Sequence, residues 1–307
     1  MIFLLLSVSA SLGIGMIFKH TGRQGVDRMV LLTANYAAAM LAGFASVAVR
    51  GMDGGGALSP GLLALAGTSG VFFIGGFFLL SLATEVAGMS LAIGVMRVSV
   101  VIPFLASWIV WAEVPTPAQG GGLVLAAAAF FLIARREAPA TGVPAAGVPA
   151  AGAPHGERKA ARAFPVLALL FVVGGLIDTF MKAFDEGFAA ETSRSLFLAI
   201  VFGAAFGVGL MVVVHRTRRA GTRPSRRAID PGAIGWGVLL GVANYASAEF
   251  FLLAVDRLSG PFVFPANNIA IVIGGALLGV AFWKEHLSRL NWAGLGLAAV
   301  ALLLLNL

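Results

Sequence analysis

The chain has 307 residues, of which 59% are hydrophobic and only 11% charged, and its formal net charge is +7. A soluble domain carries about 25% charged residues, so this composition excludes an ordinary soluble globular protein and favours a membrane protein. The basic residues lie in short loops between apolar runs, so the positive charge does not indicate a groove for nucleic acid. No cysteine is present, which excludes disulfides and thiolate metal sites.

Ten apolar runs follow one another along the chain. Most have the length that a helix needs to cross about 30 Å of hydrocarbon, although the fifth and tenth are short. Their residues do not alternate as in the strands of a membrane barrel, so the runs are predicted to be transmembrane helices. The runs lie at residues 2–18, 29–49, 58–83, 87–111, 119–134, 164–184, 195–214, 232–254, 259–283 and 290–306.

A segment of different composition separates the fifth run from the sixth. Residues 135–163 are rich in Pro, Ala and Gly and have no periodic apolar face, which predicts a flexible linker. The linker divides the chain into a first half, residues 1–134, and a second half, residues 164–307, with five spans each.

The two halves contain an internal repeat. Residues 78–133 match residues 250–305 without a gap when they are shifted by 172 positions, and a weaker match aligns the two first spans. Equivalent residues include Phe78 and Phe250, Gly88 and Gly260, Trp111 and Trp283, Glu113 and Glu285, and Lys19 and Lys182. An odd number of spans per half makes the second half enter the membrane from the opposite side. The predicted fold is therefore an all-α membrane protein with ten transmembrane helices, arranged as two inverted five-helix repeats.

Each repeat contains an apolar span, the motif Trp-x-Glu, a short polar turn and a Gly-rich span. Together with the five-plus-five layout, this pattern resembles the EamA-type branch of the drug/metabolite transporter superfamily. Residues 262–268, followed by Trp283-Lys284-Glu285, resemble a subgroup of uncharacterised bacterial members. The resemblance implies transport of amino acids, nucleotide sugars, purines, quaternary amines or drugs, and it does not select among them. It also implies that both termini lie in the cytoplasm.

The distribution of basic residues predicts the opposite orientation. Sixteen of the 21 Lys and Arg residues fall in loops on one side, four fall on the other side, and Arg97 lies within a span. By the positive-inside rule, the crowded side is cytoplasmic and both termini lie outside. We expect a multi-pass protein of the inner membrane and follow the charge pattern for its orientation.

Charged side chains within spans are candidates for a substrate site, because lipid does not tolerate them. Arg97 lies in the middle of span four and is a candidate clamp for an anionic group such as a carboxylate. Glu249 lies one turn after Tyr245 on the same face of span eight, where it is a candidate to bind a cationic group or a coupling proton. The alternative is an Arg97–Glu249 ion pair that only holds the helices together.

Other polar residues extend the predicted site. Asn267 and Asn268 follow two prolines in span nine, so they are candidate substrate contacts on a loosened helix, or else hydrogen-bond partners of neighbouring helices. Asn244 is included with Tyr245 because Glu249 is near. Asp178 is a second candidate for proton coupling. Its alternative role, a local (i, i+4) salt bridge with Lys182, is the one we expect.

Glu113 and Glu285 each follow a tryptophan at the end of a helix, which favours anchors at the membrane interface. No phosphate-binding loop, histidine metal spacing or nucleophile motif is present, so no enzyme activity, metal or cofactor is predicted.

The predicted function is secondary active transport of a small polar, amino-acid-like metabolite or another organic solute. Alternating access would move it through a cavity between spans one, three, four, six, eight and nine, with proton coupling or exchange. The alternatives are a transporter or flippase of apolar drugs or lipids, and a channel. The expected partners are the solute and the bilayer, with no nucleic acid, and the protein is expected to be a monomer or homodimer.

Overall fold

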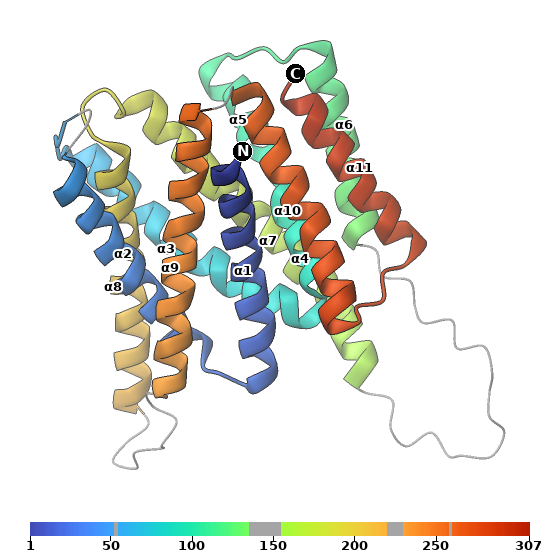
Figure 1. The fold of residues 1–307 in the computed structure, drawn as a ribbon, viewed down its shortest axis with the longest axis horizontal. Helices are drawn as coiled ribbons and strands as arrows, with labels where there is room; N and C mark the ends of the chain where they lie inside the picture. Colours follow the sequence, from blue (N-terminus) through green and yellow to red (C-terminus); the bar gives the residue numbers. More distant parts are fainter. Residues whose placement is uncertain (52–54, 135–154, 220–229, 258–259) are drawn as a thin grey trace.

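The computed structural model describes residues 1–51, 55–134, 155–219, 230–257 and 260–307. Helices form the regular structure of these residues, besides one isolated bridge between Gly56 and Thr192. The helices are α1 (Ile2–Gln24), α2 (Arg28–Arg50), α3 (Pro60–Val86), α4 (Met89–Val98), α5 (Val101–Trp111), α6 (Pro117–Ala134), α7 (His155–Gly187), α8 (Arg194–Arg219), α9 (Pro231–Arg257), α10 (Gly260–Trp283) and α11 (Arg289–Leu305). Most of them run between two ends of the molecule, and both termini lie at the same end (Figure 1). The prediction of an all-helical fold is confirmed for these residues.

Several helices have the properties of membrane spans. Within the described residues, seven helical stretches are long and apolar enough to cross a bilayer: Ile2–Gln24, Arg28–Val49, Pro60–Val86, Met89–Trp111, Ala163–Gly187, Arg194–Arg219 and Ala266–Trp283. The helices Pro117–Ile133 and Arg289–Leu305 are also apolar but shorter. Large apolar side chains such as Ile109, Met211 and Phe282 point outward and are exposed, as a lipid-facing surface requires. The chain is a multi-pass membrane protein.

The predicted fourth span is broken into two helices. Pro103 has no N–H to donate to the carbonyl of Ser99, four residues earlier, and its ring crowds that carbonyl. Ile102 donates to the Ser99 carbonyl instead, over 2.9 Å, and the Ser99 hydroxyl donates to the carbonyl of Met96 over 2.6 Å. Helix α4 therefore ends at Val98, and α5 begins at Val101. The break places Arg97 in the last turn of α4 rather than in the middle of a continuous helix.

Two further boundaries differ from the prediction. Helix α7 begins at His155, inside the expected linker 135–163, while residues 135–154 lie outside the described residues. Helix α10 runs unbroken from Gly260 to Trp283, although Pro265 lies within it. The helix that we expected to be loosened beside Asn267 and Asn268 is continuous, and a break occurs in the other half, at Ser99 and Val100.

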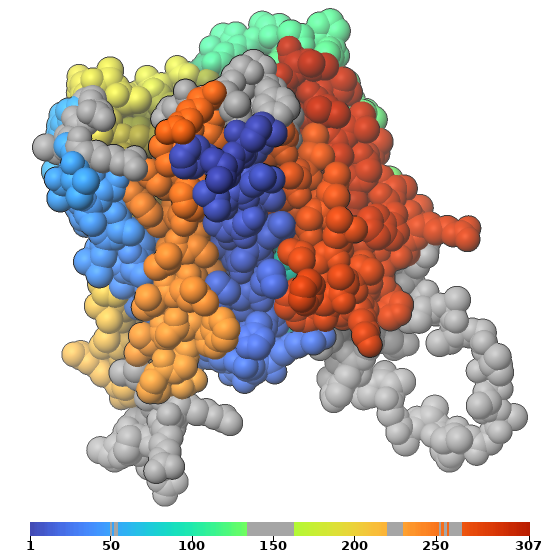
Figure 2. All heavy atoms as spheres, in the orientation of Figure 1, coloured from blue at the N-terminus to red at the C-terminus, as the bar shows by residue number. Residues whose placement is uncertain are grey.

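The halves pack mainly against each other. Helix α2 contacts α8 and α9, α1 contacts α9 and α10, and α4 contacts α10. On the face in Figure 2, α1 fills the space between α9 and α10. A side chain in place of the hydrogen of Gly122 in α6 would touch Leu304 and Leu305, and one on Gly294 in α11 would touch Leu132 and Ile133. These glycine contacts are reciprocal, since the sequence repeat pairs Gly122 with Gly294, Leu132 with Leu304 and Ile133 with Leu305.

Candidate functional site

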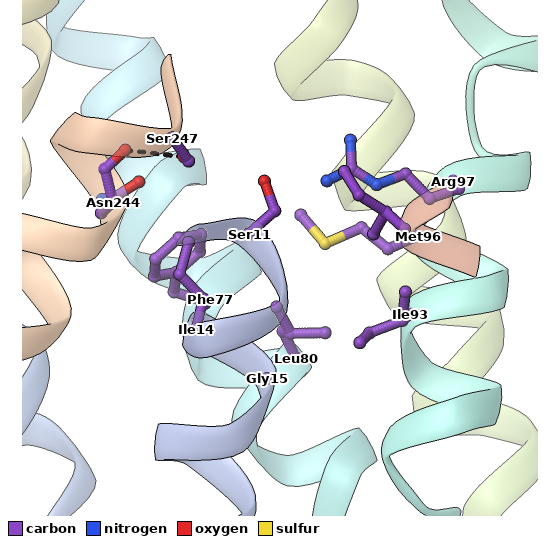
Figure 3. Close-up of a pocket in the computed structure, with 11 residues that line it drawn as sticks. Ser11, Ile14, Gly15, Phe77, Leu80, Ile93, Met96, Arg97, Asn244 and Ser247 are labelled. Atoms are coloured by element: carbon purple, nitrogen blue, oxygen red, sulfur yellow. Dashed lines mark hydrogen bonds between the residues drawn. The ribbon is translucent and has the colours of Figure 1, made fainter. Parts of the chain in front are cut away.

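A cavity of about 170 Å³ lies between α1, α3, α4, α9 and α10. These helices correspond to five of the six spans that were expected to line it. In Figure 3, Arg97 and Met96 of α4 lie on one side, Asn244 and Ser247 of α9 lie on the other, and Ser11 of α1 lies between them. The lining residues are Ser11, Ile14, Gly15, Phe77, Leu80, Ile93, Met96, Arg97, Asn244, Ser247 and Ile271.

Arg97 supplies a positive charge to this cavity. Its side chain is half-buried, and Nη1 donates a hydrogen bond of 3.2 Å to Oδ1 of Asn268 in α10. The Asn268 amide therefore holds the guanidinium in place, and the planar fork offers further N–H donors to an anionic group. Arg97 and Asn268, both candidate substrate contacts, are thus in direct contact, although Asn268 does not line the cavity.

Asp178 is an acidic residue near Arg97, although no ion pair joins the two side chains. The charges of Asp178 in α7 and Arg97 interact. The side chain of Asp178 is exposed although it lies well inside the long helix α7, and it does not line the cavity. The expected Asp178–Lys182 bridge is wrong, because Lys182 instead pairs with Glu113 at 2.7 Å and Glu186 at 2.8 Å. Spacing along one helix cannot reveal such partners on other helices.

The opposite wall of the cavity presents neutral polar groups. Asn244 is buried, and its Nδ2 has no hydrogen-bond partner among the described residues. The Ser247 hydroxyl donates to the backbone carbonyl of Asn244 over 2.8 Å, and Ser11 adds a third polar side chain to the cavity. A buried amide donor without a partner is costly, and a polar solute in the cavity would satisfy it. Ser11 and Ser247 were missed, since a lone serine in a membrane span gives no distinctive signal.

Asn267 has a structural partner instead. The Ser7 hydroxyl donates to Oδ1 of Asn267 over 3.2 Å and is also 3.0 Å from the carbonyl of Ser247. These contacts join α1, α9 and α10, and Asn267 does not line the cavity. The inter-helix hydrogen bonding considered for the two asparagines therefore describes Asn267, whereas Asn268 contacts Arg97.

Tyr245 and Glu249 form a pair outside the cavity lining. The Tyr245 hydroxyl donates to Oε2 of Glu249 over 3.3 Å, as expected for residues that share a helix face. Both side chains are partly buried. The alternative of an Arg97–Glu249 pair stays a prediction.

A second polar cluster, the Lys19 cluster, lies at one end of the bundle. Lys19 of α1 and Glu285 of the α10–α11 turn pair at 3.0 Å, and their side chains are only 13% and 10% exposed. Glu285 also accepts hydrogen bonds from the amide of Met89 at 2.7 Å and from the amide and hydroxyl of Ser90 at 3.1 Å and 2.8 Å. Burial favours a raised pKa for Glu285, but Lys19 and these donors together hold the pKa below its usual value.

The structure adds a role that was not expected for Glu285. Its carboxylate caps the N-terminus of α4, where the helix dipole stabilises a negative charge. Gly88, with φ +102°, and Gly279 leave the room that the Glu285 carboxylate occupies. Glu113 is half exposed and bound to Lys182, whose hydrogen bond lowers the pKa of Glu113.

Comparisons with known proteins support the fold and leave the function open. No family model matches the chain. A protein of Haemophilus influenzae, described only as uncharacterized, is 27% identical over 241 residues, which span 77% of this chain and 72% of that protein. One crystal structure, whose description gives no function, is similar to this chain with a TM-score of 0.60 and 16% sequence identity. The similarity covers 99% of this chain and 94% of the chain in that crystal structure. The chain thus shares its whole architecture with a protein of known structure.

Proposed function

We propose that this protein is a secondary transporter that moves a small polar, amino-acid-like solute by alternating access. The observation that carries the proposal is the cavity within the helix bundle, where Arg97 faces Ser11, Asn244 and Ser247 across an otherwise apolar lining. A carboxylate would bind the Arg97 fork, and the unpartnered Nδ2 of Asn244 would meet an acceptor on the same solute. Neither the sequence nor the described residues offer a nucleotide or metal site to drive transport, so an ion gradient or exchange supplies the energy.

The size and lining of the cavity favour a small solute over a drug or lipid. Pockets for drug-sized ligands measure about 300–1,000 Å³, whereas this cavity measures about 170 Å³. An apolar ligand would also leave the guanidinium and the Asn244 amide unsatisfied, which is unfavourable in a buried site. These two observations therefore count against a flippase or a drug carrier, and a ligand screen distinguishes these classes from a carrier of small polar solutes.

Asp178 is the better of the two candidates for proton coupling. Its charge acts directly on Arg97, whereas Glu249 is bound by Tyr245 outside the lining. A proton on Asp178 would release Arg97 for the solute carboxylate, which links the two binding events. We expect Asp178→Asn to retain exchange of solute while losing uphill uptake driven by a pH gradient. Glu249→Gln serves as the comparison and should retain both activities.

The architecture that we propose is the inverted repeat of the EamA-type transporters, in the inner membrane. Its support is the gap-free sequence repeat and the reciprocal contacts of Gly122 and Gly294. Two halves related by a pseudo-twofold axis make each contact twice, with the roles of the halves exchanged. The contacts of Gly122 and Gly294 have this property.

The first test is a thermal-shift screen of the purified protein in detergent against amino acids, nucleosides, amines and sugars at two pH values. A solute that binds only the folded state at 100 times its Kd stabilises it by about 2.7 kcal/mol. We expect a hit among carboxylated solutes, lost in Arg97→Ala. Counterflow of the hit in proteoliposomes would establish a carrier, whereas conductance without saturation would indicate a channel. Stabilisation only by apolar compounds would refute the proposed substrate class.

A further inference from the structure

Two Lys–Glu pairs occupy equivalent places at opposite ends of the molecule. Lys19 of α1 binds Glu285 in the second half, and Lys182 of α7 binds Glu113 in the first half. The sequence repeat aligns the two lysines with each other and the two glutamates with each other. Figure 1 shows the α10–α11 connection at one end of the bundle and the α5–α6 turn at the other. Each pair therefore joins the two halves at its own end.

The two pairs differ in the exposure of their side chains and in the number of hydrogen bonds that support them. The side chains of Lys19 and Glu285 are 13% and 10% exposed, whereas those of Lys182 and Glu113 are 26% and 51% exposed. Glu285 also takes the hydrogen bonds from Met89 and Ser90, while Lys182 is shared between Glu113 and Glu186.

The sequence explains this asymmetry. The repeat places Pro261 at the position of Met89 and Phe262 at the position of Ser90. Proline has no N–H and phenylalanine has no hydroxyl, so these two donors to Glu285 have no counterpart for Glu113. An ion pair supported by several charge-assisted hydrogen bonds is stronger than an exposed pair, which contributes little.

The packing around the cavity also differs between the Lys19 end and the Lys182 end. Toward the Lys19 end, Gly15 and Gly275 lie directly against Ile93, so α1, α4 and α10 close over one another. Toward the other end, Asp178 is exposed one helical turn inward from Lys182. The packing beside Lys19 is thus tight, whereas the side chains beside Lys182 are more exposed.

We propose that Lys19–Glu285 and Lys182–Glu113 are alternating latches, and that this structure is held closed at the Lys19 end because only that latch has the Met89 and Ser90 donors. The inference rests on the proposed transport function, since alternate opening of the two ends is what such a transporter requires. Breaking the Lys19 latch shifts the population toward the state that is closed at the Lys182 end.

The native chain has no cysteine, so pairs of introduced cysteines can carry spin labels at known positions. Gln24 and Arg289 are exposed across the Lys19 end, and Val114 and Ala190 are exposed at the Lys182 end. Double electron–electron resonance should show Glu285→Gln lengthening the first distance and shortening the second, by more than the width of the wild-type distributions. Lys19→Gln keeps the Glu285 cap on α4 and should give the same two shifts, which separates latch opening from misfolding.

Two control variants sharpen this test. Glu113→Gln should leave both distances unchanged, because the Lys182–Glu113 pair is exposed and Lys182 keeps its bond to Glu186. Asp185→Asn removes an equivalent charge from the exposed Asp185–Arg194 pair and should also change nothing. Unchanged distances in both Glu285→Gln and Lys19→Gln would overturn the latches even if transport is demonstrated. Opposite shifts at the two ends without any transported solute would support the latches and count against the proposed function.

Discussion

Arg97 carries a charge that its surroundings must compensate. A central arginine costs about 2.5–3.5 kcal/mol on membrane-insertion scales. The structure offsets this cost with the amide of Asn268 and the charge of Asp178, and it leaves part of the guanidinium facing the cavity. The break after Val98 places Arg97 in the last turn of a helix of only 10 residues.

We expect Arg97→Lys to lose solute binding although it keeps the charge. Lysine has no planar fork, so it cannot bind Asn268 and a carboxylate with the same geometry. The solute Kd should rise at least about tenfold, which corresponds to about 1.4 kcal/mol. Titration of the thermal shift with solute measures this change. Arg194→Lys, at an exposed pair, is the control and should leave the Kd unchanged; equal affinity in both variants would remove Arg97 from the site.

Glu285 gives a pH dependence of known sign. Its pKa in the folded protein lies below the ordinary 4.5, so its stabilising effect is complete above that pH and is lost as the pH falls through the folded value. The melting temperature of the wild type should therefore fall more steeply than that of Glu285→Gln between about pH 5 and pH 3. Differential scanning fluorimetry in detergent measures both slopes. Glu113→Gln should follow the wild type closely, because an exposed pair contributes little; identical slopes for the wild type and Glu285→Gln would contradict the buried cap.

Among the elements, α7 approaches the broken span through glycine. A Cβ on Gly175 would lie 2.5 Å from Cβ of Ile102 and 2.8 Å from the carbonyl oxygen of Ser99. Gly174 lies similarly against the hydroxyl of Ser99. The small residues of α7 therefore let the junction of α4 and α5 pack directly against it, next to Arg97 and Asp178.

Gly175→Ala should destabilise the protein by about 1–3 kcal/mol through overpacking, since backbone atoms cannot move aside as a side chain can. The matched control is Gly207→Ala in α8, where a Cβ meets nothing within 4 Å. That control should be neutral or slightly stabilising, because alanine favours helix over glycine by about 1 kcal/mol. Thermal denaturation of the two variants side by side measures the difference, and equal melting temperatures would show that α7 can move away from Ile102.

The helices were largely predictable, whereas their partners were not. Apolar runs as long as a membrane span identified the helices, because lipid leaves the backbone no other choice. The break at Ser99 depends on a proline four residues later, and we placed the loosened backbone in span nine instead. Arg97 and Asn268 were selected because polar atoms in lipid are conspicuous, yet the partner of Asp178 was assigned to its own helix. For Glu285, the repeated Trp-x-Glu and the aligned lysines already contained a signal that the motif served the packing of the two halves.

The whole molecule has an uneven distribution of charge between its ends. Arg216, Arg218 and Arg219 lie at the exposed end of α8, opposite the end that carries both termini (Figure 1). The positive-inside rule places the arginine-rich end in the cytoplasm. We therefore expect both termini to lie outside.

Cysteines at Arg218 and Leu307 test this orientation, because the chain has no other thiol. A membrane-impermeant maleimide added to intact cells should label Leu307→Cys, whereas Arg218→Cys should react only after the membrane is permeabilised. The reverse pattern would support the cytoplasmic termini that the family resemblance implies.

The packing of the halves against each other also affects how the protein is made. Helix α2 ends at Arg50, while its partner α9 begins at Pro231, 181 residues later in synthesis. At about 5–20 residues per second, α2 waits on the order of 10–40 s before α9 has left the ribosome. During that time Asn35, fully buried in the finished protein, faces lipid or the insertion machinery. We therefore expect the first half to reach its final packing only after the second half has been made.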